Sequence, residues 1–261
     1  MPIKARQREE LLTAISAVAV EAGAAIMEVY QSNFTVSEKA DTSPVTAADE
    51  NAEKLIVAAL ETLTPHTPIV AEEQVARGDV PDISSGMFWL VDPLDGTREF
   101  ISRNGEFTVN IALVDDGAPV LGVVYLPVTS RLYAGAADLG ATAATGDGPL
   151  QTITARQPLP EGIYVVASRS HLNPETEAFV ADLPVADIKN VGSSLKFCMV
   201  AEAAADIYPR LARTMEWDTA AGHAVLLAAG GSVITLDGTP LTYGKPGFEN
   251  PHFVARGRAS D

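Results

Sequence analysis

Two aspartates in the run Asp92-Pro93-Leu94-Asp95-Gly96-Thr97 are the residues of this chain best suited to chemistry. They directly follow the apolar run Met87-Phe88-Trp89-Leu90-Val91, which predicts a buried strand that ends where the carboxylates begin. Mg²⁺ prefers oxygen ligands of this kind, and the backbone N–H groups of Gly96 and Thr97 can contact a phosphate. The run therefore indicates a site for a divalent cation and a phosphate, although an Asp-x-x-Asp pair alone is common in turns.

Further acidic residues are spread along the chain, as a site assembled in three dimensions requires. The pair Glu72-Glu73 follows the apolar run Pro68-Ile69-Val70-Ala71, Asp49 lies in a stretch that predicts the start of a helix, and Asp218 follows Trp217. Carboxylates crowded together repel one another and raise one another's pKa. Such a group should bind cations even without a substrate.

Together these motifs resemble those of the inositol monophosphatase-like superfamily of magnesium-dependent, lithium-sensitive phosphatases. The shared features are the Glu-Glu pair, Asp-Pro-(Leu/Ile)-Asp-Gly-Thr, and a later Trp-Asp followed by an Ala-Gly-rich helix, and they span nearly the whole chain. The surrounding residues are similar to one branch, the bacterial 3'(2'),5'-bisphosphate nucleotidases of the CysQ group. The similar runs are Arg98 to Ile101, Asn104 to Leu113, Gly192 to Cys198, Ala205 to Arg210 and Met215 to Gly222.

The resemblance implies a fold and a metal site. The fold is α+β / α/β, a layered αβαβα sandwich of the inositol monophosphatase/fructose-1,6-bisphosphatase type, with the site between its two halves. Two or three Mg²⁺ ions are implied: Glu72, Asp92 and the Leu94 carbonyl hold one, and Asp92, Asp95 and Asp218 hold its neighbour. Separations of roughly 3.5–4 Å are typical of such ion pairs.

The resemblance also implies catalytic roles. Thr97 orients the attacking water, and Asp49 accepts the proton of the Thr97 hydroxyl, so the expected catalytic residues are Asp49, Glu72, Asp95 and Thr97. From the residues alone, Asp49 is equally an exposed residue that the helix dipole favours, and Gly96-Thr97 is equally a helix cap. Glu73 either supports the ligands from behind or is only solvated.

A bisphosphate has a second phosphate that is not cleaved, and cationic side chains match its charge. Ser193, Lys196 and Arg210 are the candidates, while Ser193 as a helix cap and Lys196 as an exposed helix residue are the alternatives. His171 matches a position near the adenosine in relatives, although a lone loop histidine is more often a bystander. The full expected substrate set is Glu72, Leu94, Asp95, Gly96, Thr97, His171, Ser193, Lys196, Arg210 and Asp218.

The expected function is hydrolysis of adenosine 3',5'-bisphosphate to AMP and phosphate, together with action on 3'-phosphoadenylyl sulfate in sulfur assimilation. An inositol monophosphatase or a broad sugar-phosphate phosphatase is the alternative within the enzyme class, because the metal site is shared. A cation- or nucleotide-binding regulatory protein without catalysis is the alternative of another class. Retention of both Thr97 and Asp49 argues against it.

Composition sets limits on partners and compartment. The 261 residues include 18 Lys and Arg against 34 Asp and Glu, so the net charge of −16 argues against nucleic acid polymers and anionic membranes as diffuse partners. The single cysteine, Cys198, suits a reducing compartment and predicts an inert core thiol. A cytoplasmic protein is expected, with peripheral association at the inner membrane and a choice between monomer and homodimer left open.

Helical spacing of apolar residues from Leu11 to Val29 predicts an amphipathic helix over about 8–31 rather than a signal peptide or a membrane span. A second helix is predicted over 46–63. Strands follow at 86–91, 107–114, 119–126 and 131–135, and the small-residue stretch 135–148 predicts a loop.

Beyond Pro158-Leu159-Pro160 the pattern changes to alternating strands and helices. Strands are expected at 162–168, 187–191 and 206–209, and helices at 174–182, 193–204 and 218–229, closed by Gly230-Gly231. Two domains are therefore predicted: residues 1–158 as an α+β unit with most metal ligands, and residues 159–261 as an α/β unit that contributes Asp218 and substrate contacts.

Overall fold

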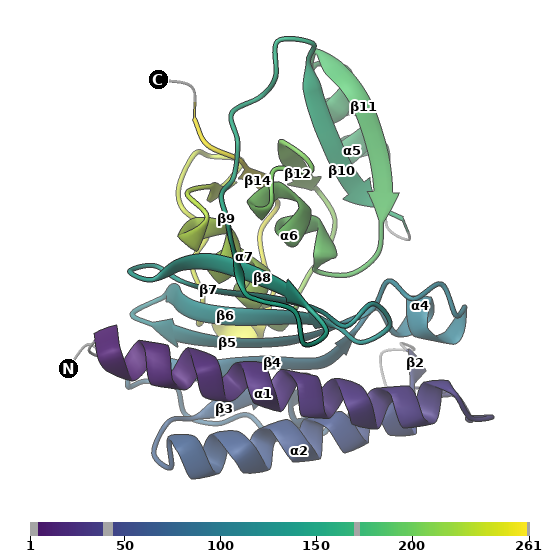
Figure 1. The fold of residues 1–261 in the computed structure, drawn as a ribbon, viewed down its shortest axis with the longest axis vertical. Coiled ribbons are helices and arrows are strands. Elements are labelled where there is room, and N and C mark those ends of the chain that lie inside the picture. Colours follow the sequence, from purple (N-terminus) through teal and green to yellow (C-terminus); the bar gives the residue numbers. More distant parts are fainter. Residues whose placement is uncertain (1–4, 39–43, 170–172, 260–261) are drawn as a thin grey trace.

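The structure is a computed structural model, and it describes residues 5–38, 44–169 and 173–259. It consists of five layers in the order helices, sheet, helices, sheet, helix (Figure 1). The predicted αβαβα sandwich is therefore confirmed.

The first two layers come from the N-terminal half. Helices α1 (Ala5–Tyr30) and α2 (Ala47–Leu63) pack on each other and cover one face of a seven-stranded sheet of order β3-β4-β5-β6-β7-β8-β9 (Figure 1). All neighbouring strands are antiparallel except the parallel pair β3 and β4. The strands are β3 (Ile69–Ala71), β4 (Met87–Asp95), β5 (Thr108–Asp115), β6 (Ala118–Leu126), β7 (Arg131–Ala136), β8 (Gly140–Thr145) and β9 (Gln151–Ile153). The short pair β1 (Ser37–Glu38) and β2 (Pro44–Val45) forms a separate ribbon.

The other layers come from the C-terminal half. Helices α6 (Leu195–Ala201) and α7 (Glu216–Ala228) lie between the large sheet and a five-stranded sheet of order β11-β10-β12-β14-β13. Helix α5 (Pro174–Ala181) covers the far face of this second sheet. Its strands are β10 (Ile163–Ser168), β11 (Val185–Val191), β12 (Ile207–Arg210), β13 (Ser232–Thr235) and β14 (Phe253–Arg256), and the 3₁₀ turn η1 (Pro246–Phe248) precedes β14.

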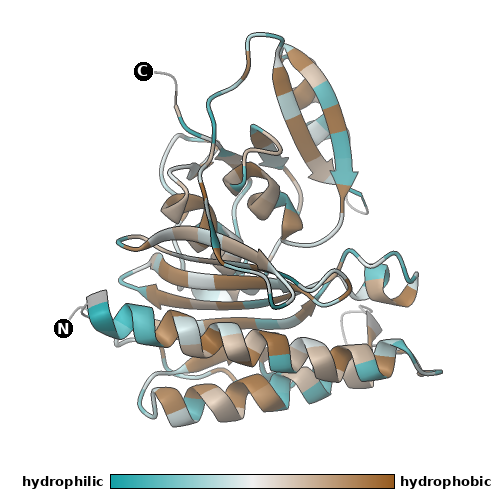
Figure 2. Cartoon of the chain, viewed as in Figure 1, coloured by the Kyte–Doolittle hydropathy of each residue, from teal (hydrophilic) through white to brown (hydrophobic). Residues whose placement is uncertain are grey.

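Apolar periodicity accounts for the packing of α1. Leu11, Ile15, Ala19, Ala22 and Ile26 recur at helical spacing and are buried against α2 and the sheet. By length and composition this helix could also cross a membrane. Figure 2 shows hydrophobic and hydrophilic residues interspersed along it, and the hydrophobic residues named above pack into the core, so in this fold it is a core helix.

The predicted loop over 135–148 is wrong, because the stretch contains β8 and the turn that leads to it from β7. Alanine and glycine are poor strand formers, so the sequence favours a loop there. The segment is nevertheless a strand, because β8 pairs with both β7 and β9 and buries Ala141 and Ala143 in the core. The other predicted helices and strands are present with shifted ends. The sequence did not predict the short elements β1, β2, β3, α3 (Glu72–Ala76), β9, β13, η1 and β14.

Small residues let α7 approach the large sheet closely. A Cβ added at Gly122 on β6 would lie 2.6 Å from the carbonyl oxygen of Ala221, and one at Gly135 on β7 would lie 2.8 Å from the Cα of Val225. Neither distance is tolerable without backbone movement. Helix α7, which begins two residues before Asp218, is thereby held against the sheet that contains Asp95.

A buried histidine on α7 makes the fold sensitive to acid. His223 accepts or donates a hydrogen bond at 2.9 Å with the Tyr243 hydroxyl, and burial lowers the pKa of His223 to about 3. In the unfolded chain, His223 takes up a proton near pH 6.5. The buried neutral ring therefore contributes fully to the unfolding free energy above pH 6.5, and this contribution is lost as the pH falls towards 3.

We expect the wild-type protein to lose about 2 kcal/mol of unfolding free energy between pH 7.5 and pH 5 relative to His223→Gln, which cannot take up a proton. Urea unfolding at both pH values measures the difference. A constant gap between the two proteins would show that the His223 ring titrates normally in the folded state.

Candidate active site

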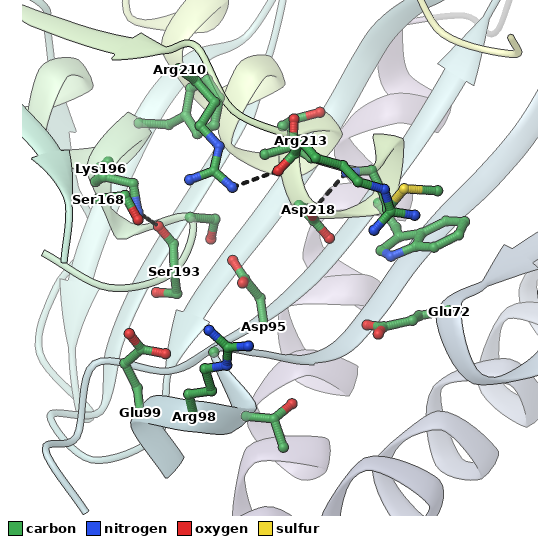
Figure 3. Close-up of a pocket in the computed structure, with 18 of the residues that line it drawn as sticks. Glu72, Asp95, Arg98, Glu99, Ser168, Ser193, Lys196, Arg210, Arg213 and Asp218 are labelled. Atoms are coloured by element: carbon green, nitrogen blue, oxygen red, sulfur yellow. Dashed lines mark hydrogen bonds between the residues drawn. The ribbon is translucent and has the colours of Figure 1, made fainter. Parts of the chain in front are cut away.

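A cavity of about 510 Å³ lies where the two halves of the chain meet, with carboxylates from four elements and two buried cations around it (Figure 3). Strand β4 and helix α3 supply one side, and the residues around α6, β12 and α7 supply the other. The expected site residues that line it are Glu72, Asp95, Gly96, Thr97, Ser193, Lys196, Arg210 and Asp218.

The Asp-Pro-Leu-Asp run ends β4 with a kink that separates its two carboxylates. Asp92 is paired with Asn110 on β5 and Asp95 with Thr108, so three steps along β4 match two along β5. The buried Asp92 accepts the N–H of Leu94 at 3.0 Å, whereas Asp95 points into the cavity (Figure 3). Asp92 and Leu94, the other two expected metal ligands on β4, are buried and are not among the residues that line the cavity.

Thr97 begins helix α4 (Thr97–Ile101), and Gly96 precedes it at φ 94°, a conformation that favours glycine. The Thr97 hydroxyl lies 3.2 Å from Asp49 Oδ1 and 3.4 Å from the Leu94 carbonyl. Asp49 is fixed in turn, because its Oδ2 accepts the N–H and the hydroxyl of Thr46 at 2.8 and 2.7 Å. The predicted pair is thus in contact, and Asp49 is buried rather than exposed.

Glu72 is the first residue of the five-residue helix α3, and it faces the cavity from the side opposite Lys196 (Figure 3). Glu73 is buried, and its N–H donates to Glu53 at 2.7 Å. The interpretation of Glu73 as a merely solvated residue is therefore wrong.

Asp218 lies in the first turn of α7, where its Oδ2 accepts the N–H of Met215 at 2.9 Å. A carboxylate in a first helical turn is favoured by the helix dipole. The other oxygen remains available on the cavity side, close to Asp95 (Figure 3).

Burial and like charge raise the pKa values of Asp95 and Asp218, which with Glu72 form the acidic side of the cavity. Burial raises the pKa of Asp95 to about 6, with Lys196 opposing the rise and Glu99 and Glu72 adding to it. Burial, followed by the charges of Asp95 and Glu72, raises the pKa of Asp218 to about 8. Cations would relieve this repulsion. Among the described residues, no group of three or more acidic, histidine or cysteine side chains lies close enough together to hold a metal ion, although the carboxylates line one cavity.

The opposite side, called the cationic side below, carries the buried cations Lys196 and Arg210 together with the carboxylate of Glu99. Lys196 is buried, contacts the face of the Tyr208 ring at 5.1 Å, and has its pKa lowered to about 8 by burial, against the attraction of Asp95. Arg210 is also buried and donates to the Arg213 carbonyl at 2.7 Å, while its Nε has no hydrogen-bond partner among the described residues. The interpretation of Lys196 as an exposed helix residue is therefore wrong.

Ser193 does not cap α6, since Ser194 is the residue before that helix; Ser193 instead adopts a left-handed conformation with φ 50°. Its side chain lines the cavity beside Lys196 (Figure 3). The remaining expected residue, His171, lies outside the described residues.

Sequence reasoning missed a buried polar relay behind Asp95. Asn110 donates to Asp95 Oδ2 at 3.4 Å and accepts the Ser194 hydroxyl at 2.7 Å, and Ser194 also lies 2.9 Å from the Thr108 hydroxyl. The relay joins β5 of the large sheet to the start of α6. Polar residues at inward positions of the strand, Thr108 and Asn110, were the available signal.

Comparison with known proteins agrees with this architecture. The model of the inositol monophosphatase family matches residues 7–258, and the chain belongs to that family. The 3'(2'),5'-bisphosphate nucleotidase CysQ of Escherichia coli (strain K12) is 47% identical over 247 residues, which cover 93% of this chain and 98% of the relative.

Solved structures give the same result. The crystal structure of CysQ from Bacteroides thetaiotaomicron, described as a bacterial member of the inositol monophosphatase family, is 41% identical with a TM-score of 0.81, covering 97% of this chain and 98% of that chain. An inositol monophosphatase from Anabaena (Nostoc) sp. PCC 7120 is 26% identical with a TM-score of 0.75, covering 96% and 91%. The resemblance to the superfamily and to the CysQ group is confirmed.

We expect Ser194→Ala to lower the unfolding free energy by about 1–3 kcal/mol, because it leaves the buried side-chain oxygen of Asn110 without its hydroxyl donor. Denaturant unfolding measures the loss. Ser193→Ala is the matched control, since the Ser193 hydroxyl makes only a 3.5 Å contact, and it should change stability by less than about 0.5 kcal/mol. Equal effects of the two substitutions would show that the hydrogen bonds of Ser194 do not stabilise the fold.

Proposed function

We propose that this chain is a Mg²⁺-dependent 3'(2'),5'-bisphosphate nucleotidase that hydrolyses adenosine 3',5'-bisphosphate to AMP and phosphate. The observation that supports the substrate is the two-sided cavity, in which carboxylates face the buried cations Lys196 and Arg210. A substrate with two phosphates can place one on each side, whereas a monophosphate would leave the buried cations unmatched. The similarity to the relatives named as bisphosphate nucleotidases supports the same assignment.

The carboxylates fit magnesium by chemistry and by charge. They are oxygen donors, and two of them are recessed where their negative charges repel each other. We assign Glu72, Asp92, Asp95, Asp218 and the Leu94 carbonyl as the residues that would hold two or three ions. Bound there, the ions would neutralise the scissile phosphate, lower the pKa of water and stabilise the leaving oxygen.

The chain's own residues then orient the attack. The Thr97 hydroxyl donates its proton towards Asp49 Oδ1, which leaves the Thr97 oxygen to accept a hydrogen bond from water. Thr46 holds Asp49 in one orientation, so Asp49 can accept the proton that Thr97 relays. Gly96 and Thr97 at the start of α4 would contact the phosphate oxygens.

Substrate specificity is assigned to the cationic side. Lys196, Arg210 and Ser193 would bind the phosphate that is not cleaved, and His171 is retained as a proposed contact to the adenosine. Hydrolysis of 3'-phosphoadenylyl sulfate and a role in sulfur assimilation in the cytoplasm follow from the same assignment. The buried thiol of Cys198, whose pKa is raised well above its ordinary value by burial, is consistent with an inert core residue.

Phosphate release from equal concentrations of adenosine 3',5'-bisphosphate, inositol 1-phosphate and fructose 1,6-bisphosphate, with magnesium, tests the proposal. We expect a large preference for the nucleotide, inhibition by lithium, and loss of most turnover in Asp95→Asn. Preference for inositol phosphate would overturn the substrate, and bisphosphate binding without phosphate release would favour a regulatory protein.

The role of the cationic side has its own test. Lys196→Met should raise KM for adenosine 3',5'-bisphosphate by more than about tenfold, since a charge-assisted contact is worth about 1.5–3 kcal/mol. The effect on adenosine 3'-monophosphate, which lacks the second phosphate, should be less than about threefold. Lys54→Met replaces an exposed lysine on α2 and should leave both values unchanged. An equal loss on the two substrates would contradict the assignment of Lys196 to the second phosphate.

A further inference from the structure

A buried glutamate outside the cavity holds one of its walls. Glu53 lies on α2, one helical turn after Asp49, and its side chain is 3% exposed. Its Oε2 accepts the N–H groups of Glu73 at 2.7 Å and Gln74 at 3.3 Å, and its Oε1 pairs with Arg77 at 2.8 Å. All three donors belong to α3 or its end, so one carboxylate fixes that helix.

Helix α3 needs an external partner of this kind. The residue before the helix is Ala71, which has no side-chain acceptor, and the first N–H groups of any helix lack partners within it. A five-residue helix also gains little from its own hydrogen bonds. The position of α3 therefore depends on contacts from outside, and Glu53 supplies the acceptor from 20 residues away.

Glu72 is the residue of α3 that this arrangement affects most directly. It is the first residue of the helix, next to Glu73, whose N–H makes the shortest bond to Glu53. Glu53 itself is not part of the cavity lining, and its two oxygens already have three donors. Glu53 is therefore not placed to bind a cation in the cavity directly, and the contacts that link it to the cavity run through the backbone of α3.

We infer that Glu53 is a positioning residue that holds Glu72 in place for cation binding, an inference that rests on the proposed assignment of Glu72 as a metal ligand. Helix α2 then orients two parts of the site from one face. Asp49 fixes the Thr97 hydroxyl, and Glu53, one turn further on, fixes the backbone that bears Glu72. Groups that orient metal ligands from behind typically change metal affinity by about 10–100-fold when removed.

The test is a titration of the full chain with Mn²⁺ alone, without substrate, in which electron paramagnetic resonance measures the free ion. Glu53→Met keeps the length of the side chain and removes the acceptor, so the Kd for Mn²⁺ should rise by about 10–100-fold. Glu53→Gln keeps one carbonyl oxygen for the N–H groups of Glu73 and Gln74, and it should stay within about threefold of the wild-type Kd. Arg77→Met removes only the ion pair and is the matched control, expected within about twofold.

Glu72→Gln in the same titration separates the two hypotheses. Weak binding by Glu72→Gln with normal binding by Glu53→Met would overturn the positioning role and leave the ligand assignment standing. Normal binding by Glu72→Gln would overturn the ligand assignment itself. Equal losses in Glu53→Met, Glu53→Gln and Arg77→Met would mean a general loss of stability, which contradicts the inference.

If Glu53→Met does not fold, as circular dichroism would show, Glu53→Asp replaces it. Aspartate keeps the charge but is one methylene shorter, so it cannot reach both N–H groups in the same geometry. A Kd raised by more than about tenfold in Glu53→Asp but not in Glu53→Gln would support placement of the helix rather than charge. The reverse order would contradict it.

Discussion

The mutual repulsion of carboxylates that share one cavity is the constraint on which the rest of the site depends. Asp95 and Asp218 are recessed on different elements, and each raises the energy of the other's charge. A flexible protein would separate them. Here each carboxylate sits on an element held from behind: Asp95 by the Asn110 relay, and Asp218 by the N–H of Met215 and the close packing of α7 on Gly122. The fold keeps the charges together so that cations can relieve them.

The same rigidity has to extend across the two halves of the chain, since the cavity takes residues from both. Glu106, between α4 and β5, accepts two hydrogen bonds from Arg169 at 3.0 and 2.8 Å and one from the N–H of Gly192 at 2.8 Å. Arg169 and Gly192 follow β10 and β11, and Gly192 directly precedes Ser193. The bridge therefore ties the loop before β5 to the segment that leads to Lys196, beside the relay through Ser194. The largest apolar cluster also contains residues from both sheets, including Val114 and Phe253.

Most of the helices and strands could be predicted from sequence because their signals are local, whereas the layered fold and the roles of the site residues were expected from the family resemblance. Helical periodicity identified α1, and the Asp-Gly turn identified the hairpin of β5 and β6. Strand β8 could not be predicted, since its alanines acquire strand conformation only by pairing with β7 and β9. Burial of Lys196 was equally hidden, because it results from the packing of α6 between two sheets. Contacts such as Glu53 with Glu73 link residues 20 apart, and no local pattern encodes them.

The charges on the two sides of the cavity affect each other. Burying Lys196 and Arg210 costs solvation energy that no carboxylate of the described residues repays through a direct ion pair with either side chain. Asp95 offsets part of this cost at longer range, as its effect on the pKa of Lys196 shows. An anion bound between the two cations would offset more, and cations among the carboxylates would remove the attraction that Asp95 now exerts on Lys196. Cations bound on the acidic side would therefore make an anion on the cationic side more favourable. A bisphosphate provides this pattern of charge, with one phosphate for each side.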